Sequence, residues 1–365
     1  MQTNLTEASR EWFNRGPDER YLSIQELKNA VEKRRHESWS TTPECKDIRV
    51  IPTQDNDLRV RVYDPTKGED RDLVPSNWAF GQLSGYAGAP AGYLRKLPAE
   101  LAAINLQWGL ENHGQRDDAL VLGHSNGSDR LRAVTTTTYG RIWDIDVVRA
   151  VEKANFDGRW VIPAASYTTT NPKRATTLYA SDRDVFIFLV DPKNPIEVGG
   201  EQLFRGFFAW NSEVGAAAFG LTTFLYRYVC DNRIVWGATD VKELRIRHTR
   251  SAPERFAYEG AKYLKRYAEE STETVSKQIT AARNKDVMSE INSKNGDTVE
   301  SWLQKRGFTK AEAKGSVEAA TMEMGQARSL WDVINGVTAY SRSVTHTDDR
   351  ISLETKAGKL LDLVG

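Results

Sequence analysis

The sequence predicts an α+β fold: an antiparallel or mixed β body with a helical insert, followed by a helical C-terminal region. Three observations favour this class. Residues 48–63, 119–139 and 176–248 hold short runs of alternating or β-branched and aromatic residues, which are typical of strands. Residues 76–113 hold short helical segments separated by glycine and proline. After Pro253 the β-branched runs become few, and Glu, Lys, Ala and Arg prevail, as in helices.

Length and composition limit the class of protein. The chain has 365 residues, enough for one large domain or two ordinary ones. Lys and Arg together number 50, as do Asp and Glu, so any nucleic-acid surface must come from local segregation of charge. The two cysteines and five histidines show no zinc-ligand spacing, and no apolar run has membrane-spanning length. We expect a cytoplasmic protein that needs no cofactor, no metal and no membrane.

Changes in composition divide the chain into three parts. Residues 1–20 are polar and are expected to form an N-terminal arm. Residues 21–252 carry the predicted strands and form the α+β body. Residues 253–365 form a helical C-terminal region that packs on the body, since Trp331 and Asn335 lie on a helix face that we interpret as a contact with the sheet.

Three of the expected helices begin at a residue that can cap them. Ser23 precedes a helix over residues 24–36, and Glu26 stands three residues later, as in a capping box. Ser76 precedes the first helix of the insert. Thr309 and Glu312 repeat the capping-box pattern in the C-terminal region.

Two hairpins and a run of further strands make up the expected β structure. Residues 48–53 and 58–63 alternate on either side of Asp55-Asn56-Asp57. Residues 119–124 and 130–139 flank an Asn-Gly pair, which supplies the positive φ of a tight turn. Further strands are expected at 176–180, 184–191 (broken by Pro192 and Pro195), 203–211, 216–229 and 241–248.

Motifs of several enzyme classes are absent from the sequence. It contains no GxxxxGK[ST] phosphate loop, no GxGxxG after a strand and no GxSxG. Nucleotide hydrolysis and dinucleotide binding in their usual forms are therefore not expected. A role that is not enzymatic is favoured.

Two arginine-rich clusters are candidate phosphate-binding sites. The first surrounds a strand and its exit and consists of Arg130, Arg132, Tyr139 and Arg141. Arg130 and Arg132 are two residues apart, which puts them on one strand face, either as a phosphate-binding edge or as a solvated, salt-bridged face. The second follows a strand end and consists of Arg245, Arg247, His248 and Arg250.

Two further clusters combine aromatic and polar residues at strand ends. One consists of Arg205, Trp210, Asn211, Ser212 and Glu213. It is either a turn, because Asn and Ser bond to nearby backbone, or a site where a tryptophan stacks on a base. The other consists of Arg227, Tyr228, Cys230, Asp231, Asn232 and Arg233. Cys230 is interpreted as a buried, inert thiol ahead of a nucleophile.

Four blocks, in order, resemble a known family. They contain Leu-Pro-x-Glu-Leu, Arg-Ala-Val, Asn-Ser-x-x-Gly with Arg-x-x-Cys-x-Asn, and Trp-x-x-x-Asn-x-x-Thr, and lie in residues 78–110, 131–148, 207–237 and 330–341. The chain resembles the phage- and plasmid-borne family called domain of unknown function nine-three-two. Arg233 departs from the small or polar residue that this family tends to have after the Cys-x-Asn corner.

The resemblance implies a genetic setting and no established activity. Members of that family are found in phages, prophages and plasmids, which implies a task on DNA such as recombination or protection of single strands. We therefore expect a homo-oligomeric accessory protein that binds or anneals single-stranded DNA. The expected contact residues are Arg132, Tyr139, Arg141, Arg205, Trp210, Asn211, Arg227, Asn232, Arg245, Arg247 and His248. Arginines interleaved with aromatic residues are suited to a single strand.

Two alternatives remain open. A metal-dependent nucleic-acid enzyme would bring together Asn211, Glu213, Asp231 and His248 in one pocket, where the side-chain oxygen atoms of the first three suit Mg²⁺. A protein-binding factor acting on a host complex would use exposed tryptophans and the C-terminal helices, because aromatic residues anchor interfaces.

Overall fold

The computed structural model confirms the α+β class, with two six-stranded sheets and a helical C-terminal region. No helix within the described residues has the length and the hydropathy needed to cross a membrane. The expected N-terminal arm up to residue 18 and the corner from Cys230 to Arg233 lie outside the described residues. The structure describes residues 19–112, 116–126, 128–155, 157–162, 176–198, 200–227, 236–269, 272–291, 296–341, 353 and 356–364.

The first sheet lies in the N-terminal part and has the order β2-β6-β7-β5-β4-β3. Its strands are β2 (Ser38–Thr41), β3 (Arg49–Pro52), β4 (Leu58–Asp64), β5 (Glu69–Pro75), β6 (Leu120–Asn126) and β7 (Ser128–Thr135). Only β5 and β7 pair in parallel among these neighbours, so the sheet is mixed. Both predicted hairpins are confirmed, as β3 with β4 and as β6 with β7.

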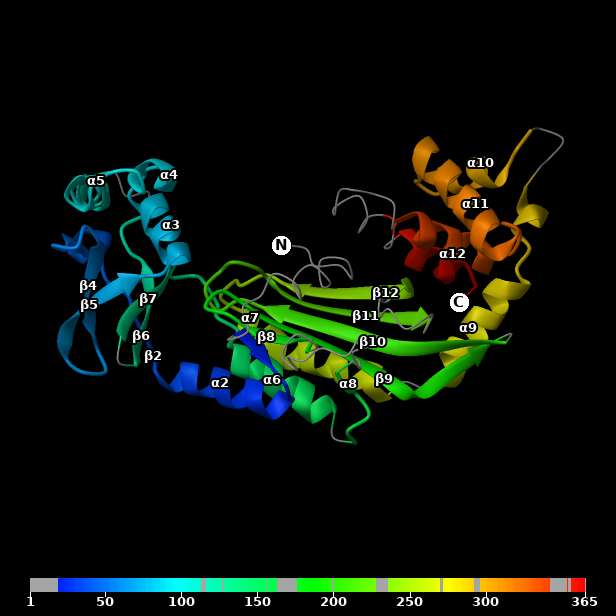
Figure 1. Cartoon of the computed structure of the whole chain (residues 1–365), viewed down its shortest axis with the longest axis horizontal. Coiled ribbons are helices and arrows are strands. Elements are labelled where there is room, and N and C mark those ends of the chain that lie inside the picture. Colours follow the sequence, from blue (N-terminus) through cyan, green and yellow to red (C-terminus); the bar gives the residue numbers. More distant parts are fainter. Residues whose placement is uncertain are drawn as a thin grey trace.

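The helical insert packs on this sheet (Figure 1). It consists of α3 (Asn77–Tyr86), α4 (Ala91–Leu94) and α5 (Ala99–Asn112). The Ser76 hydroxyl accepts a hydrogen bond from the backbone N–H of Ala79 at 3.1 Å, which confirms the predicted cap. Leu83 and Leu106 belong to the apolar core between helices and sheet.

The second, central sheet is antiparallel and has the order β1-β8-β9-β10-β11-β12. Its strands are β1 (Arg20–Tyr21), β8 (Leu178–Ala180), β9 (Val185–Val198), β10 (Glu201–Asn211), β11 (Phe219–Arg227) and β12 (Trp236–Ile246). The expected break at Pro192 and Pro195 is wrong, because β9 continues through both. The register with β10 shifts between Leu203 and Arg205, opposite the prolines.

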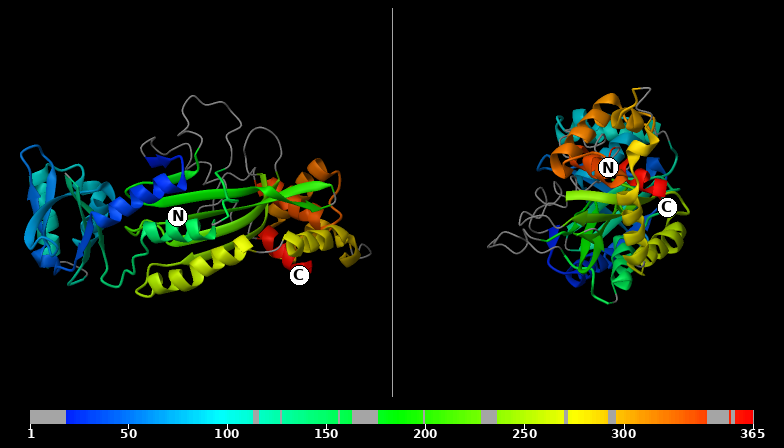
Figure 2. Two further views of the ribbon diagram at one scale, coloured as in Figure 1. Left: turned by 90° about the horizontal axis from the view of Figure 1, so that it is seen from below. Right: turned by 90° about the vertical axis from the view of Figure 1, so that its right-hand side faces the viewer.

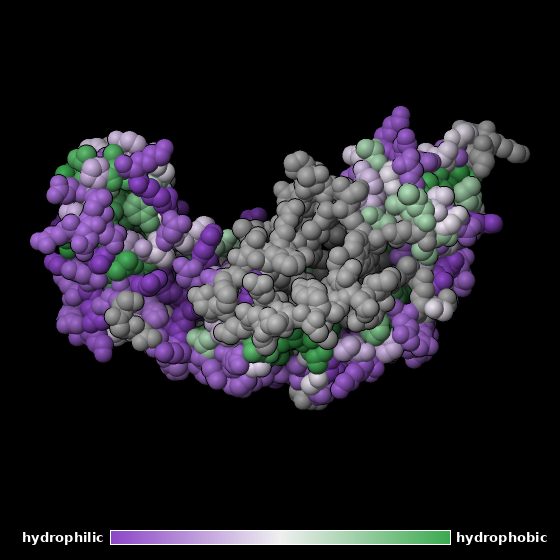
Figure 3. All heavy atoms as spheres, viewed as in Figure 1, coloured by the Kyte–Doolittle hydropathy of each residue, from purple (hydrophilic) through white to green (hydrophobic). Residues whose placement is uncertain are grey.

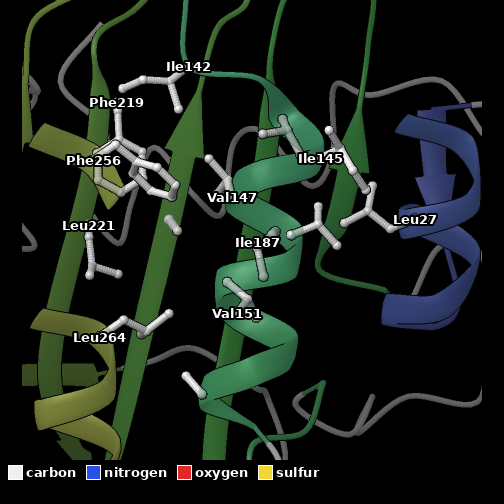
Figure 4. Packing of buried hydrophobic residues seen from close by; sticks show 14 of the residues in the cluster. Leu27, Ile142, Ile145, Val147, Val151, Ile187, Phe219, Leu221, Phe256 and Leu264 are labelled. Carbon is white, nitrogen blue, oxygen red and sulfur yellow. The ribbon is translucent and has the colours of Figure 1, made fainter. Parts of the chain in front are cut away.

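Helices cover one face of the central sheet. They are α2 (Ile24–His36), α6 (Asp144–Ala154), α7 (Ala252–Arg255) and α8 (Ala261–Glu269), with the π-helical turn Phe256–Gly260 before α8. Figure 2 shows α2, α6 and α8 side by side across the sheet. Leu27, Val151, Ile187, Leu221 and Phe256 meet in the core between them (Figure 4).

The opposite face of the sheet is aromatic. Side chains alternate along a strand, so Ile187 and Phe207 face the helices while Phe186 and Phe208 face away. The ring of Phe208 lies 5.5 Å from that of Trp210, centroid to centroid. The other rings of this cluster are Tyr179, Phe188 and Phe204, and all are buried.

The C-terminal helices pack against the far end of the central sheet. They are α9 (Thr272–Asn284), α10 (Val299–Gln304), α11 (Lys310–Met324) and α12 (Leu330–Ser341). Their core includes Leu203 and Leu225 from the sheet. Thr309 and Glu312 form the predicted capping box. These helices and the N-terminal sheet project from the same side of the central sheet (Figure 1).

Gly220 on β11 is required by the aromatic face, because a Cβ there would lie 1.9 Å from the Trp210 ring. We predict that Gly220→Ala lowers the free energy of unfolding by about 1–3 kcal/mol through overpacking. Urea denaturation followed by tryptophan fluorescence measures this. Gly92→Ala in α4 is the matched control, since its Cβ would meet no atom within 4 Å. Equal stabilities of the two variants would contradict the assignment.

Candidate functional site

The two sheets are joined at one junction. The segment after β7 packs against the chain that follows β12: the Gly140 N–H donates to the His248 carbonyl at 3.2 Å. A Cβ at position 140 would lie 1.9 Å from the carbonyl oxygen of Thr249, so only glycine fits. The loop between β10 and β11 also belongs to the junction, because the Tyr139 hydroxyl donates to the Ser212 carbonyl at 2.8 Å.

Glu213 lies at the centre of this junction and is 1% exposed. One carboxylate oxygen, Oε2, is 2.8 Å from Nη2 of Arg132 on β7. The other, Oε1, accepts the backbone N–H of Asp144 at 2.9 Å, at the start of α6. Its backbone carbonyl accepts Nε of Arg141 at 3.1 Å. One residue of the central sheet therefore contacts the N-terminal sheet and α6 together.

Asp144 is the second buried carboxylate of the junction. It accepts the Asn211 amide at 2.8 Å, and Nη1 of Arg34 lies 3.7 Å away. The same Asn211 amide donates to the carbonyl of Ile142 at 2.9 Å. Burial, and then the nearby charge of Glu213, raise the pKa of Asp144 well above its ordinary value, against the lowering effect of Arg34. The junction therefore holds two buried carboxylates, each beside its own arginine: Arg132 for Glu213 and Arg34 for Asp144.

An aromatic stack closes the junction. The rings of Tyr139 and His248 are stacked with centroids 4.8 Å apart, and the guanidinium of Arg141 lies 5.5 Å from the Tyr139 ring. His248 Nδ1 lies 3.0 Å from the Gly140 carbonyl. Burial lowers the pKa of His248 to about 4 and that of Arg141 to about 10, and it raises the pKa of Tyr139. His248 is therefore neutral at neutral pH.

The structure brings together five of the sequence-predicted site residues that the sequence had placed in three separate clusters. They are Arg132, Tyr139, Arg141, Asn211 and His248. Arg132 and Arg141 are 5% and 8% exposed, and Asn211 is fully buried. The expected contact of Arg132, Arg141 and Asn211 with DNA is corrected here, because these three side chains are buried and bonded to groups inside the protein.

Arg205 and Trp210 are also interior residues. Arg205 is 1% exposed on the helix-covered face, where Nη1 donates to the Tyr267 carbonyl at 3.2 Å and Asp191 lies 3.8 Å away. Trp210 is 4% exposed within the aromatic face, so the expected stacking of its ring on a base is not available in this structure. Arg227 lies on β11, with its side chain outside the description, and Asn232 lies outside the described residues.

Arg245 and Arg247 differ from the other predicted arginines, because both are exposed. Arg245 lies on the edge strand β12 opposite Gly220, which in turn pairs with β10 at Trp210. Its neighbours Leu244 and Ile246 pack towards the helices, so Arg245 points to the other side of the sheet. Arg250 is exposed as well. Over the described ranges none of the three forms an ion pair.

Sequence reasoning missed two members of the junction, Asp144 and Arg34. Asp144 begins α6 and its side chain is buried. A signal was present: the acid stands between Trp143 and Ile145, both apolar. An acid among apolar residues indicates burial with a partner, although it does not name the partner.

For the alternative of a metal-dependent enzyme, the described residues contain no supporting cluster of metal ligands. In the parts of the chain that the structure describes, no three His, Cys, Asp or Glu side chains are placed to hold one metal ion. Glu213 is ion-paired with Arg132, and Asp231 lies outside the description.

Glu213→Gln leaves Arg132 buried without its counter-charge. We predict a loss of about 3–5 kcal/mol in the free energy of unfolding, which chemical denaturation measures. Asp72→Asn is the matched control, because it neutralises the carboxylate of the exposed Arg61–Asp72 pair, and it should cost about 1 kcal/mol or less. Similar losses in both variants would mean that the buried pair does not anchor the junction.

His248 makes stability depend on pH. Its folded pKa of about 4 lies below the ordinary value of 6.5, so in this range the unfolded chain binds a proton that the folded chain does not. We predict that stability falls as the pH falls from 6.5 towards 4, by up to about 1.4 kcal/mol per pH unit. Asp144, with its raised pKa, acts in the opposite direction.

His248→Gln should flatten this fall, whereas His36→Gln, at an exposed position, should leave it unchanged. Denaturation midpoints measured across the acidic range test both variants. Parallel pH profiles for wild type and His248→Gln would rule out His248 as the source.

Comparison with known proteins identifies a family and no named relative. Searches of curated proteins and of solved structures return no match. A family model described as a domain of unknown function, DUF932, matches residues 169–358, which is more than half of the chain. The match runs from before β8 to beyond α12 and so covers most of the central sheet and the C-terminal helices. The chain therefore belongs to the DUF932 family, as the resemblance of its four blocks implied.

Proposed function

We propose that this chain is a DNA-associated accessory protein of a phage or other mobile element, which binds or anneals single-stranded DNA in the cytoplasm of a bacterial host. The observation that supports the proposal is the pair of exposed arginines, Arg245 and Arg247, at the end of edge strand β12. Among the arginines that were expected to contact DNA and whose side chains the structure describes, these two are exposed, whereas Arg132, Arg141 and Arg205 are buried.

The availability of these charges follows from their surroundings. Arg132 and Arg205 lie beside internal carboxylates, and a cation that is already paired adds little to phosphate binding. Arg245 and Arg247 have no such partner among the described side chains, so a phosphate that approaches them displaces only water and counterions. Affinity from this source depends on salt and little on sequence.

The direction of Arg245 suits an extended ligand. Arg245 points to the side of the central sheet that lies opposite α2, α6 and α8. On this side the N-terminal sheet and the C-terminal helices project (Figure 1). A single strand that follows the edge of β12 would lie between these two parts. The aromatic face beneath is buried, so it supports the edge and does not itself stack on bases.

A second candidate function, the binding of a protein partner, is favoured by a different observation. Helix α5 carries an apolar stripe at a spacing of one helix face: Leu101, Ile104 and Trp108 are 50%, 63% and 55% exposed. Hydrophobic side chains gather over this part of the surface (Figure 3). A second copy of the chain or a host protein would bury them, and exposed aromatic residues are common anchors of such interfaces.

Arg245→Ala/Arg247→Ala is the variant that tests the proposal. We predict that its affinity for a labelled single-stranded oligonucleotide falls by about ten-fold or more, and that the slope of log affinity against log salt decreases by about 2. Fluorescence anisotropy at several salt concentrations measures both quantities. Both residues are exposed, so the variant should fold as the wild type does.

The matched control is Lys67→Ala/Lys153→Ala. It removes the same charge from the turn between β4 and β5 and from α6, beneath the sheet. Its affinity and salt slope should equal those of the wild type. The proposal fails if wild-type protein does not bind at low salt, or if the two double variants weaken binding equally.

A further inference from the structure

A pocket of about 370 Å³ opens beside the junction, between α3, the end of β7 and the loop after β10. Tyr86 and Tyr139 provide aromatic walls, and Arg116 is its charged residue. Gly85 and Gly215 line it without side chains. Its size is within the range of pockets that hold small ligands.

The walls of the pocket are held rigidly. The Gln82 side chain accepts the Val134 N–H at 3.0 Å and donates to the Val214 carbonyl at 2.8 Å, which ties α3 to β7 and to the β10–β11 loop. Stacking on His248 and the hydrogen bond to Ser212 fix the Tyr139 ring. The pocket therefore exists before any ligand binds, and a ligand would find its walls already in place.

Two residues of the pocket lining, Tyr86 and Arg116, carry polar groups. The Tyr86 hydroxyl is buried and has no hydrogen-bond partner within the described part of the chain. Burial raises the pKa of this phenol, with a smaller contribution from Asp118, while Arg116 lowers it, so the hydroxyl is a neutral donor at neutral pH. A buried donor without an acceptor costs free energy, which a ligand oxygen or ring nitrogen would recover. Arg116 is exposed at the rim and suits an anion.

We propose that this pocket binds one nucleotide unit, with the base against the Tyr86 ring and the phosphate at Arg116. Bases stack on tyrosine, and a phosphate is the anionic group that a guanidinium binds best. The unit is either a free mononucleotide or one residue of a bound strand, since both present the same chemistry. Its occupation by a strand residue rests on the proposed function, whereas its occupation by a free mononucleotide does not.

Gly85→Leu is a variant that fills the pocket without disturbing the fold. A Cβ at Gly85 would meet no atom within 4 Å, and Gly85 lies in helix α3, where leucine is favoured over glycine. Gly92→Leu is the matched control: it makes the same change in α4, also with no atom within 4 Å, away from the pocket. Tyr86→Phe is a second variant, which removes the buried hydroxyl alone.

The experiment is calorimetric titration of the full chain with each of the four deoxynucleoside monophosphates and with a short single-stranded oligonucleotide. We predict that wild type and Gly92→Leu bind equally. Gly85→Leu should weaken binding by roughly ten-fold or more, because stacking of one base is lost, and Tyr86→Phe should weaken it less. Arg245→Ala/Arg247→Ala should keep mononucleotide binding while its oligonucleotide binding falls. Melting temperatures confirm that each variant is folded.

The outcomes separate the pocket from the proposed function. If Gly85→Leu and Tyr86→Phe bind both ligands as wild type does, the pocket assignment is overturned and the strand-binding proposal stands. If wild type binds mononucleotides but no oligonucleotide, the pocket stands and the proposed function fails. If only the oligonucleotide binds, and Gly85→Leu weakens it, the nucleotide comes from the strand. If neither ligand binds, both proposals are overturned.

Discussion

The carboxylate of Glu213 holds three distant parts of the chain in one place. It lies on the loop between β10 and β11, pairs with Arg132 of the N-terminal sheet and accepts the first N–H of α6. A buried carboxylate of this kind is stable only while its cation and its donors remain in position, because an unpaired buried charge costs several kcal/mol. The relative position of the two sheets depends on this contact. The pocket beside the junction depends on it in turn.

The same constraint explains why residues that look functional in sequence are structural in space. Arginine, asparagine, tyrosine and histidine at strand ends are typical of binding sites, and Arg132, Arg141 and Asn211 have these chemistries. Each one is buried and bonded to an internal carbonyl or carboxylate, so it is not accessible to a nucleic acid in this structure. Arg245 and Arg247 carry the same chemistry without such partners in the described ranges. The presence or absence of an internal partner, and not the residue type, separates the candidate binding groups from the structural ones.

Local signals in the sequence predicted local structure well. The hairpin of β3 and β4 turns at Asn56, whose φ of 57° is one that asparagine tolerates, and Ser76 and Thr309 cap their helices as expected. Predictions that depended on partners distant in the sequence were less accurate. Pro192 and Pro195 interrupt β9 only as a register shift, because the pairing with β10 resumes beyond them. The burial of Arg205 depends on Asp191 and the Tyr267 carbonyl. The pattern of residues in the strand of Arg205 does not predict these two partners.

The family match and the junction together suggest which part of the chain contributes to each of the two proposed binding sites. Residues 169–358 include Glu213, Gly215, Arg245 and Arg247, so the edge of β12 belongs to the part shared with the family. The other walls of the pocket, Tyr86, Arg116 and Tyr139 among them, come from outside this range. A site built from both sides of this boundary requires that the two parts keep fixed relative positions. The Glu213–Arg132 ion pair holds them in these positions. Phosphate binding at the edge can then belong to the family part alone, whereas recognition of a single nucleotide requires the N-terminal sheet as well.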